Sequence, residues 1–80
     1  TAVGQLAVAS GEFSTALGSQ AAASGDDSTA LGQNSLASGF ESTAVGESAS
    51  ATGASAVAVG IAANGQGDDS AAFGDRAQSL

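Results

Sequence analysis

The sequence predicts an all-β fold, a parallel solenoid in which short strands stack coil upon coil. The chain divides into five copies of a 14-residue unit, at 1–14, 15–28, 29–42, 43–56 and 57–70, with a partial sixth at 71–80. A fixed period is the sequence signature of stacked coils. Glycine also occupies position 4 of every copy and position 11 of every complete copy. We therefore expect one small domain, residues 1–80.

Each unit contains two strand-like segments that alternate with two turns. Around the third unit, residues 28–31, which begin with the last residue of the second unit, and residues 35–38 are rich in Thr, Leu and small residues and are too short to form helices. Gly32 and Gly39 start the two turns, where we expect glycine to supply positive φ angles. Parallel stacking at about 4.8 Å per coil then predicts two sheets and a prism about 27 Å long.

The alternation of side chains along a strand predicts which positions share a face. Positions 1 and 3 point to one side, and position 2 points to the other. Position 3 is large and apolar, and we expect it to pack inside the coil against small residues at positions 7 and 9. The alanines at position 2 would then line an outer face that another protomer approaches. The opposite assignment, with position 3 at an intermolecular interface, stays open. The position 3 residues are Val3, Leu17, Leu31, Val45, Val59 and Phe73.

The fifth unit departs from the others. Val57 replaces the leading Thr, Ile61 replaces a polar turn residue, and Gly65 replaces a small side chain at position 9. Ordinary drift of a repeat accounts for these changes, and a bulge or an altered twist is the alternative.

Composition restricts both the core and the partners. The chain is 42 % hydrophobic, but most of this fraction is alanine, so an isolated chain would have a thin core. Stability must then come from stacking, from partner chains, or from both. The net charge of −7 argues against nucleic acid or an anionic membrane surface as a partner. No apolar run is long enough to span a membrane, and we expect no direct membrane contact.

The residue types required for most catalytic sites are missing. The chain has no His, Cys, Lys or Tyr, so its many serines have no side-chain base to activate them. The glycine spacing does not match a phosphate-binding loop, because no Lys and no helix follow it. We therefore expect no enzyme activity, no catalytic residue and no cofactor, and the pattern does not define ligand-binding residues.

Acidic residues follow the turn glycines. Six of the eight lie at positions 12 and 13, and the other two lie at position 5. We expect a solvated acidic edge and no metal site; one cation between coils, near Glu12 and Asp26 or near Asp27 and Glu41, is the alternative. Phe13 and Phe40 share these turns. Packing across a protomer boundary is our preferred role for both rings, and exposed contact with a ligand is the alternative.

The repeat resembles the YadA-type head repeat of the trimeric autotransporter adhesins of Gram-negative bacteria. The residues that carry the resemblance are 14–18, 28–32 and 42–46, which read Ser-Thr-Ala-Leu/Val-Gly and alternate with Ala-Ser-Gly. The resemblance implies a left-handed parallel β-roll, a homotrimer, and attachment to a host extracellular matrix protein or cell-surface receptor. It also implies a place on the bacterial cell surface, anchored in the outer membrane through stalk and anchor regions that this sequence does not contain. The motif is altered at residues 71–74.

Two other functions fit a solenoid of small residues. A spacer segment of a surface fibre needs the same stacked coils but no ligand of its own. An ice-binding solenoid displays a flat array of hydroxyl groups, and Thr15, Thr29 and Thr43 would stack in this way. That array is interrupted by Val57 and Ala71, which makes ice binding the weaker alternative.

Overall fold

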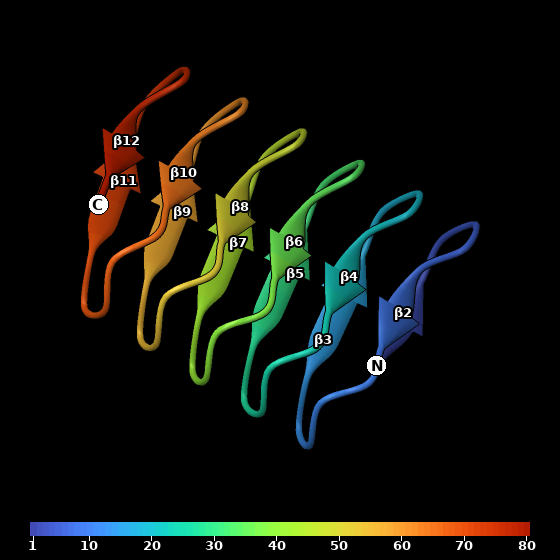
Figure 1. Cartoon of the computed structure of the whole chain (residues 1–80). Coiled ribbons are helices and arrows are strands. Elements are labelled where there is room, and N and C mark those ends of the chain that lie inside the picture. The colour runs from blue at the N-terminus through green and yellow to red at the C-terminus, as the bar shows by residue number, and fades with distance from the viewer.

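The computed structural model describes residues 1–80 and contains two six-stranded parallel sheets (Figure 1). Sheet A is formed by the first strand of each coil, in the order β1-β3-β5-β7-β9-β11, and sheet B by the second strand, in the order β2-β4-β6-β8-β10-β12. The strands of sheet A are β1 (Ala2–Val3), β3 (Thr15–Leu17), β5 (Thr29–Leu31), β7 (Thr43–Val45), β9 (Val57–Val59) and β11 (Ala71–Phe73). The strands of sheet B are β2 (Val8–Ala9), β4 (Ala22–Ala23), β6 (Leu36–Ala37), β8 (Ser50–Ala51), β10 (Asn64–Gly65) and β12 (Gln78–Ser79).

The sheets pair in the register that the repeat predicts. Thr29 of β5 aligns with Thr43 of β7, so each residue lies beside its equivalent 14 positions along the chain. The fifth coil keeps this register, with Val57 aligned to Thr43 and Asn64 to Ser50. Its unusual residues therefore introduce no bulge. The Cα trace is 28 Å in its longest dimension, which confirms the predicted length of the stack.

The core between the two sheets consists of alanine. Position 2 of sheet A and positions 7 and 9 of sheet B point inward, as does position 14 just before sheet A. The prediction for positions 7 and 9 is confirmed, whereas the prediction that position 2 faces outward is wrong. The buried alanines are Ala16, Ala21, Ala23, Ala30, Ala37, Ala44, Ala49, Ala51, Ala56, Ala58, Ala63 and Ala72.

The large residues at position 3 lie on the outside of sheet A, contrary to our preferred assignment. Val3 is 57 % exposed, Leu17 38 % and Phe73 68 %, whereas Ala16 beside Leu17 is fully buried. The narrowness of the coil explains this orientation, because the Cα trace is only 10 Å in its shortest dimension. Two backbones this close leave room for methyl and hydroxymethyl groups, and a leucine would force them apart.

Two of the serines at position 14 join the core to a turn. Ser14 and Ser28 are buried, and their hydroxyl groups donate to the carbonyl oxygens of Gly11 and Gly25 at 2.7 and 2.6 Å. Each bond satisfies a polar group inside an apolar layer. Ala56 occupies the same position in the fourth coil and is also buried, so the site accepts a side chain without a hydroxyl.

The two glycine columns have different physical causes. Gly32 at position 4 adopts a φ of +124°, which confirms the expectation for this column. Gly39 at position 11 has no positive φ, so the same expectation is wrong there. A Cβ atom on Gly39 would lie 2.6 Å from the carbonyl carbon of Gly53 in the next coil. Position 11 therefore requires glycine because successive backbones approach too closely for any side chain.

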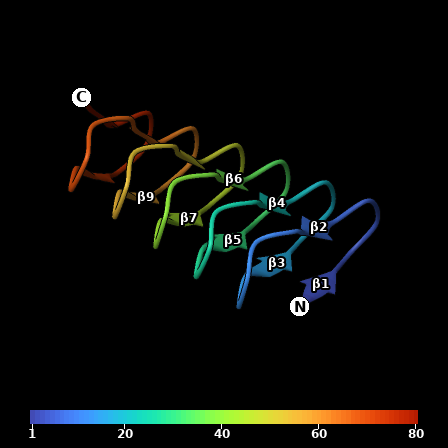
Figure 2. The ribbon, with the colours of Figure 1, turned by 60° about the horizontal axis from the view of Figure 1, so that its bottom comes forward.

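The turns themselves are stacked by hydrogen bonds. The backbone N–H of Asn34 donates to the carbonyl of Ser19 at 2.9 Å, and that of Asp27 to the carbonyl of Glu12 at 2.7 Å. Asn34 and Asp27 have φ angles of 61° and 58°, and every non-glycine residue at positions 6 and 13 is similar. Each coil thus closes through two tight turns that continue the stack along both edges of the sheets (Figure 2).

Candidate interaction surface

The molecule offers open faces and no enclosed site. No pocket is present, and no group of three acidic residues converges in a way that could hold a metal ion. The structure also contains no helix with the length and apolarity needed to cross a membrane. The open surfaces of the chain are the outer faces of the two sheets, the two edges formed by the turns, and the two ends of the stack.

The outer face of sheet A is an apolar surface in regular rows. It consists of positions 1 and 3, so Thr29 and Leu31 of one coil lie above Thr43 and Val45 of the next. In the middle of the sheet these side chains are half-buried by one another, and they are most exposed at the ends. Unpartnered rows of Val, Leu and Phe on a small protein mark an interaction surface. This face is the first candidate.

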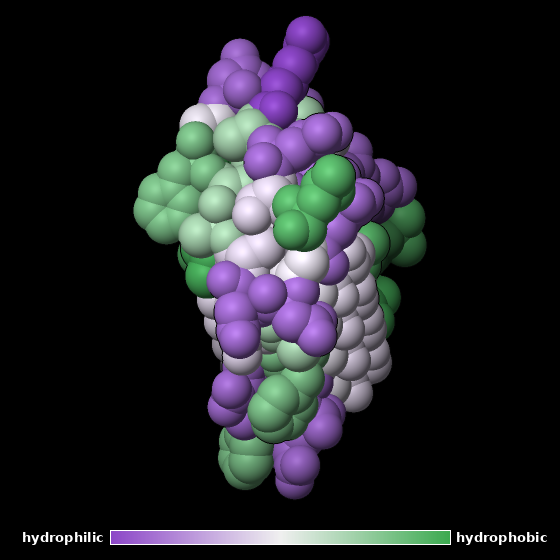
Figure 3. Space-filling view, turned by 60° about the vertical axis from the view of Figure 1, so that its left-hand side comes forward, coloured by the Kyte–Doolittle hydropathy of each residue, from purple (hydrophilic) through white to green (hydrophobic).

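The outer face of sheet B carries smaller and more polar side chains than the outer face of sheet A. It consists of positions 8 and 10, which include Ser24, Ser38 and Thr52, all exposed. Its large apolar members are scattered along the stack: Val8 is 51 %, Leu36 37 % and Leu80 83 % exposed. In a space-filling view, hydrophobic and hydrophilic patches lie beside an extended area of intermediate hydropathy (Figure 3). The sheet B face is therefore suited to weak, repeated polar contacts.

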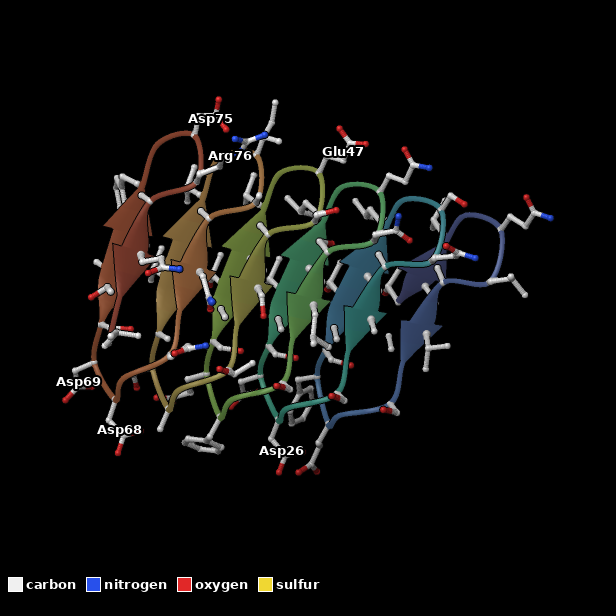
Figure 4. All side chains as sticks on the ribbon, turned by 45° about the horizontal axis from the view of Figure 1, so that its top comes forward. Asp26, Glu47, Asp68, Asp69, Asp75 and Arg76 are labelled. Carbon is white, nitrogen blue, oxygen red and sulfur yellow. The ribbon has the colours of Figure 1, made fainter.

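One edge of the solenoid collects most of the negative charge. This acidic edge is formed by the turn residues at positions 12 and 13 of each coil, and all its acids are exposed, as the sequence predicts. Asp26, Asp68 and Asp69 lie along it, while Glu47, Asp75 and Arg76 lie on the opposite edge, formed by positions 5 and 6 (Figure 4). The acids of the acidic edge are Glu12, Asp26, Asp27, Glu41, Asp68 and Asp69.

Two of these acids also support the turns. A carboxylate oxygen of Asp26 accepts a hydrogen bond from the backbone N–H of Glu12 at 3.0 Å, and Asp68 does the same for Ala54 at 3.1 Å. Glu12 and Asp26 therefore stack as predicted, but the carboxylate of Asp26 binds a backbone amide of the preceding coil. Sequence reasoning missed this role; an Asp directly after a turn glycine is the signal that points to it.

The two phenyl rings lie on the acidic edge and are exposed within the protomer. Phe13 is 83 % and Phe40 54 % exposed. Neither ring contributes to the alanine core. Their assignment to a protomer boundary or to a ligand contact thus depends on what covers this edge.

The threonine array proposed for ice binding forms, but it shares its face with aliphatic side chains. Thr15, Thr29 and Thr43 stack in register on sheet A, and Val57 continues the row. Leu and Val at position 3 lie on the same face. The result is one row of hydroxyl groups beside one row of apolar groups, which differs from a flat hydroxyl array.

The comparison with protein families accounts for the repeat. The family model described as YadA head domain repeat (2 copies) matches residues 1–21, 9–35 and 37–63, which together include all of 1–63 except residue 36. A search of curated proteins finds no match. This repeat builds the non-enzymatic heads of trimeric autotransporter adhesins, which are bacterial outer-membrane surface proteins. The chain therefore belongs to the YadA head domain repeat family.

Proposed function

We propose that residues 1–80 form a head domain that attaches a bacterium to a host extracellular matrix protein or cell-surface receptor. The observation that carries the proposal is a repeating, pocketless surface on a solenoid of the YadA head family. The head is a homotrimer of left-handed β-rolls, held away from the outer membrane by stalk and anchor regions. It has no catalytic residue, cofactor or metal site of its own.

The outer face of sheet A forms the trimer interface. Its rows include Leu17, Leu31 and Val45, large apolar residues on the surface of a chain whose own core contains only alanine among apolar residues. Burying a leucine is worth about 1.5–3 kcal/mol, so three such sheets packed around an axis stabilise one another substantially. The alternative of the sequence analysis, with position 3 between protomers, thus becomes the proposal.

The outer face of sheet B is the adhesive surface. When sheet A lies against the trimer axis, sheet B faces outward on all three chains. It repeats small hydroxyl side chains at every coil, so the trimer presents many equivalent weak contacts. Multivalent contacts raise avidity by about 10²–10⁴ without any single strong site.

Two measurements test the proposed function. Sedimentation equilibrium should show a trimer, and the trimer should bind to at least one immobilised matrix protein or cell-surface molecule. Replacing Ser10, Ser24, Ser38 and Thr52 together by Glu should abolish this binding and leave the trimer intact. The single change Ser38→Ala should leave binding within about twofold, because neighbouring coils keep their own hydroxyl groups.

The outcomes separate the proposal from its rivals. An intact trimer that binds none of the molecules would favour a spacer function. Loss of binding by Ser38→Ala alone would replace the distributed surface with a discrete site. Thermal hysteresis in solution would favour ice binding.

A further inference from the structure

The two edges of the solenoid are complementary in charge. Arg76 is the only basic residue of the chain, and it lies on the edge opposite the acidic edge. The acidic edge carries six of the eight acids and no cation. Asp75 shares a turn with Arg76, and Glu47 is the only other acid on that edge. The molecule therefore has one nearly neutral edge with a cation at its C-terminal end and one strongly negative edge.

Arg76 is too far from the acidic edge to pair with it inside one protomer. The two edges bound the width of the sheets, and the Cα trace is 22 Å in this intermediate dimension. Figure 4 places Arg76 on the edge opposite Asp68 and Asp69. A carboxylate of the acidic edge can meet Arg76 only when that carboxylate belongs to another chain.

The repeat places Arg76 and Asp69 at nearly the same height along the stack. They are seven residues apart, which is half of the 14-residue coil. Because a coil advances about 4.8 Å, half a coil corresponds to about 2.4 Å. Two chains side by side at equal height would therefore bring Arg76 of one beside the Asp68 and Asp69 turn of the other.

We propose that neighbouring protomers join edge to edge, with Arg76 of each contacting Asp68 and Asp69 of the next. This inference rests on the proposed trimer, in which sheet A of every chain faces a common axis. Rotational symmetry then keeps the chains at equal height and sets one edge of each protomer against the opposite edge of its neighbour, a head-to-tail contact that closes into a ring. Charge pairs at such a boundary fix the register of the partners.

The remaining residues of the two edges differ in how well they fit this pairing. At the N-terminal end, Leu6 is 67 % exposed on one edge and Phe13 83 % exposed on the other, but Phe13 lies seven positions after Leu6, whereas Asp69 lies seven positions before Arg76. Between the two ends, the amide side chains of Gln33 and Asn34 come to the height of the turn that carries Asp26 and Asp27. Amide donors thus meet carboxylates in the middle of the stack, whereas Asp75 comes to the height of Asp68 and places two acids together beside the Arg76 contact.

The absence of cysteine from the chain allows a direct test. The double variant Arg76→Cys with Asp69→Cys, in residues 1–80, is treated with a short bismaleimide reagent and analysed on a denaturing gel. The matched control is Arg76→Cys with Asp27→Cys, which places the second thiol on the same edge three coils away. The oligomeric state of both variants is measured by sedimentation before the reagent is added.

We expect the first variant to yield covalent dimers and trimers and the control to yield almost none. A sedimenting trimer in which neither variant is cross-linked would overturn the edge pairing and leave the proposed trimer standing. Equal cross-linking of both variants would overturn the pairing as well, because the register would then be undefined. A monomer in sedimentation would overturn the trimer and the pairing together.

Charge reversal provides a second test that needs no added thiol. Arg76→Asp should weaken the trimer, so that it dissociates at a higher protein concentration than the parent does. The reason is that the change places a third carboxylate beside Asp68 and Asp69. Combining it with Asp69→Arg should restore the original midpoint at least in part. A double variant that dissociates at the same concentration as Arg76→Asp alone would contradict a contact between these two residues.

Discussion

The inner and outer faces of sheet A differ in the size and in the solvent exposure of their side chains. The inner face presents only alanine, from Ala16 to Ala72, and it is completely closed to solvent in the central coils. The outer face presents threonine beside leucine or valine and remains partly open. Adjacent residues such as Ala30 and Leu31 therefore have different roles: Ala30 packs inside the chain, and Leu31 is available for contact with another molecule. The inner face determines how closely a chain packs on itself, and the outer face determines what the chain packs against.

This difference shows that a large apolar residue need not belong to the protomer core. In most small domains the bulky side chains are inside and alanine fills the gaps. Here alanine is inside and the bulky residues are outside, because the space between the two sheets accommodates only two backbones and their methyl groups. The bulky residues are then available for association, and in the proposed trimer the stability of the chain is linked to assembly.

The largest expected effect is from a bulky residue placed on the inner face. Ala30→Leu should destabilise the protomer by about 3 kcal/mol, because the added atoms have no space between the two backbones. Ala22→Leu is the matched control on the outer face of sheet B, where Leu36 already occupies the equivalent position. Thermal unfolding followed by circular dichroism measures both. Similar melting temperatures for the two variants would show that the inner face is not closely packed.

A methyl group between successive coils should have the next largest effect. Gly39→Ala should cost about 2–3 kcal/mol, since its Cβ would overlap the backbone of Gly53. Ser38→Ala, one residue earlier and exposed, serves as the control and should change stability by less than about 0.5 kcal/mol. Urea unfolding of the two variants compares them directly, and an unchanged midpoint for Gly39→Ala would contradict the close approach.

A charge on the outer face of sheet A should weaken assembly while each chain stays folded. Leu31→Asp should weaken the trimer by about 1.5–2 kcal/mol per chain, because it removes the burial of a leucine between protomers. The secondary structure should persist at concentrations where the variant is monomeric. Sedimentation and circular dichroism on the same samples distinguish the two effects. Loss of secondary structure in a variant that remains assembled would place Leu31 inside the protomer.

The smallest measurable effect is expected for a buried hydroxyl group. Ser28→Ala removes the hydrogen bond to the carbonyl of Gly25 and should cost about 1 kcal/mol. The exposed Ser24→Ala should have no measurable effect on the unfolding midpoint. Because Ala56 occupies the position of Ser28 in the fourth coil, a cost well above this value would indicate that the hydroxyl also organises the adjacent turn.

The sequence alone determined the coil length, the two short strands and the two turns of each unit, and the solvated positions of the acids. These follow from the spacing of Gly32 and Gly39 and from the recurrence of equivalent residues every 14 positions, which are properties of the chain before it folds. The family was also evident in the repeated motif, because its residues recur in the same order in successive units.

Only the tertiary structure decided which face of sheet A is inside. Alternation places Ala30 and Leu31 on opposite faces but does not say which of them points inward; the close approach of the two sheets decides it. The tertiary structure also explains the glycine at position 39, which is required by the close backbone of the next coil and not by its own φ angle. The distance between the two sheets decided the first point, and the distance between successive coils decided the second; neither distance can be read from the local sequence.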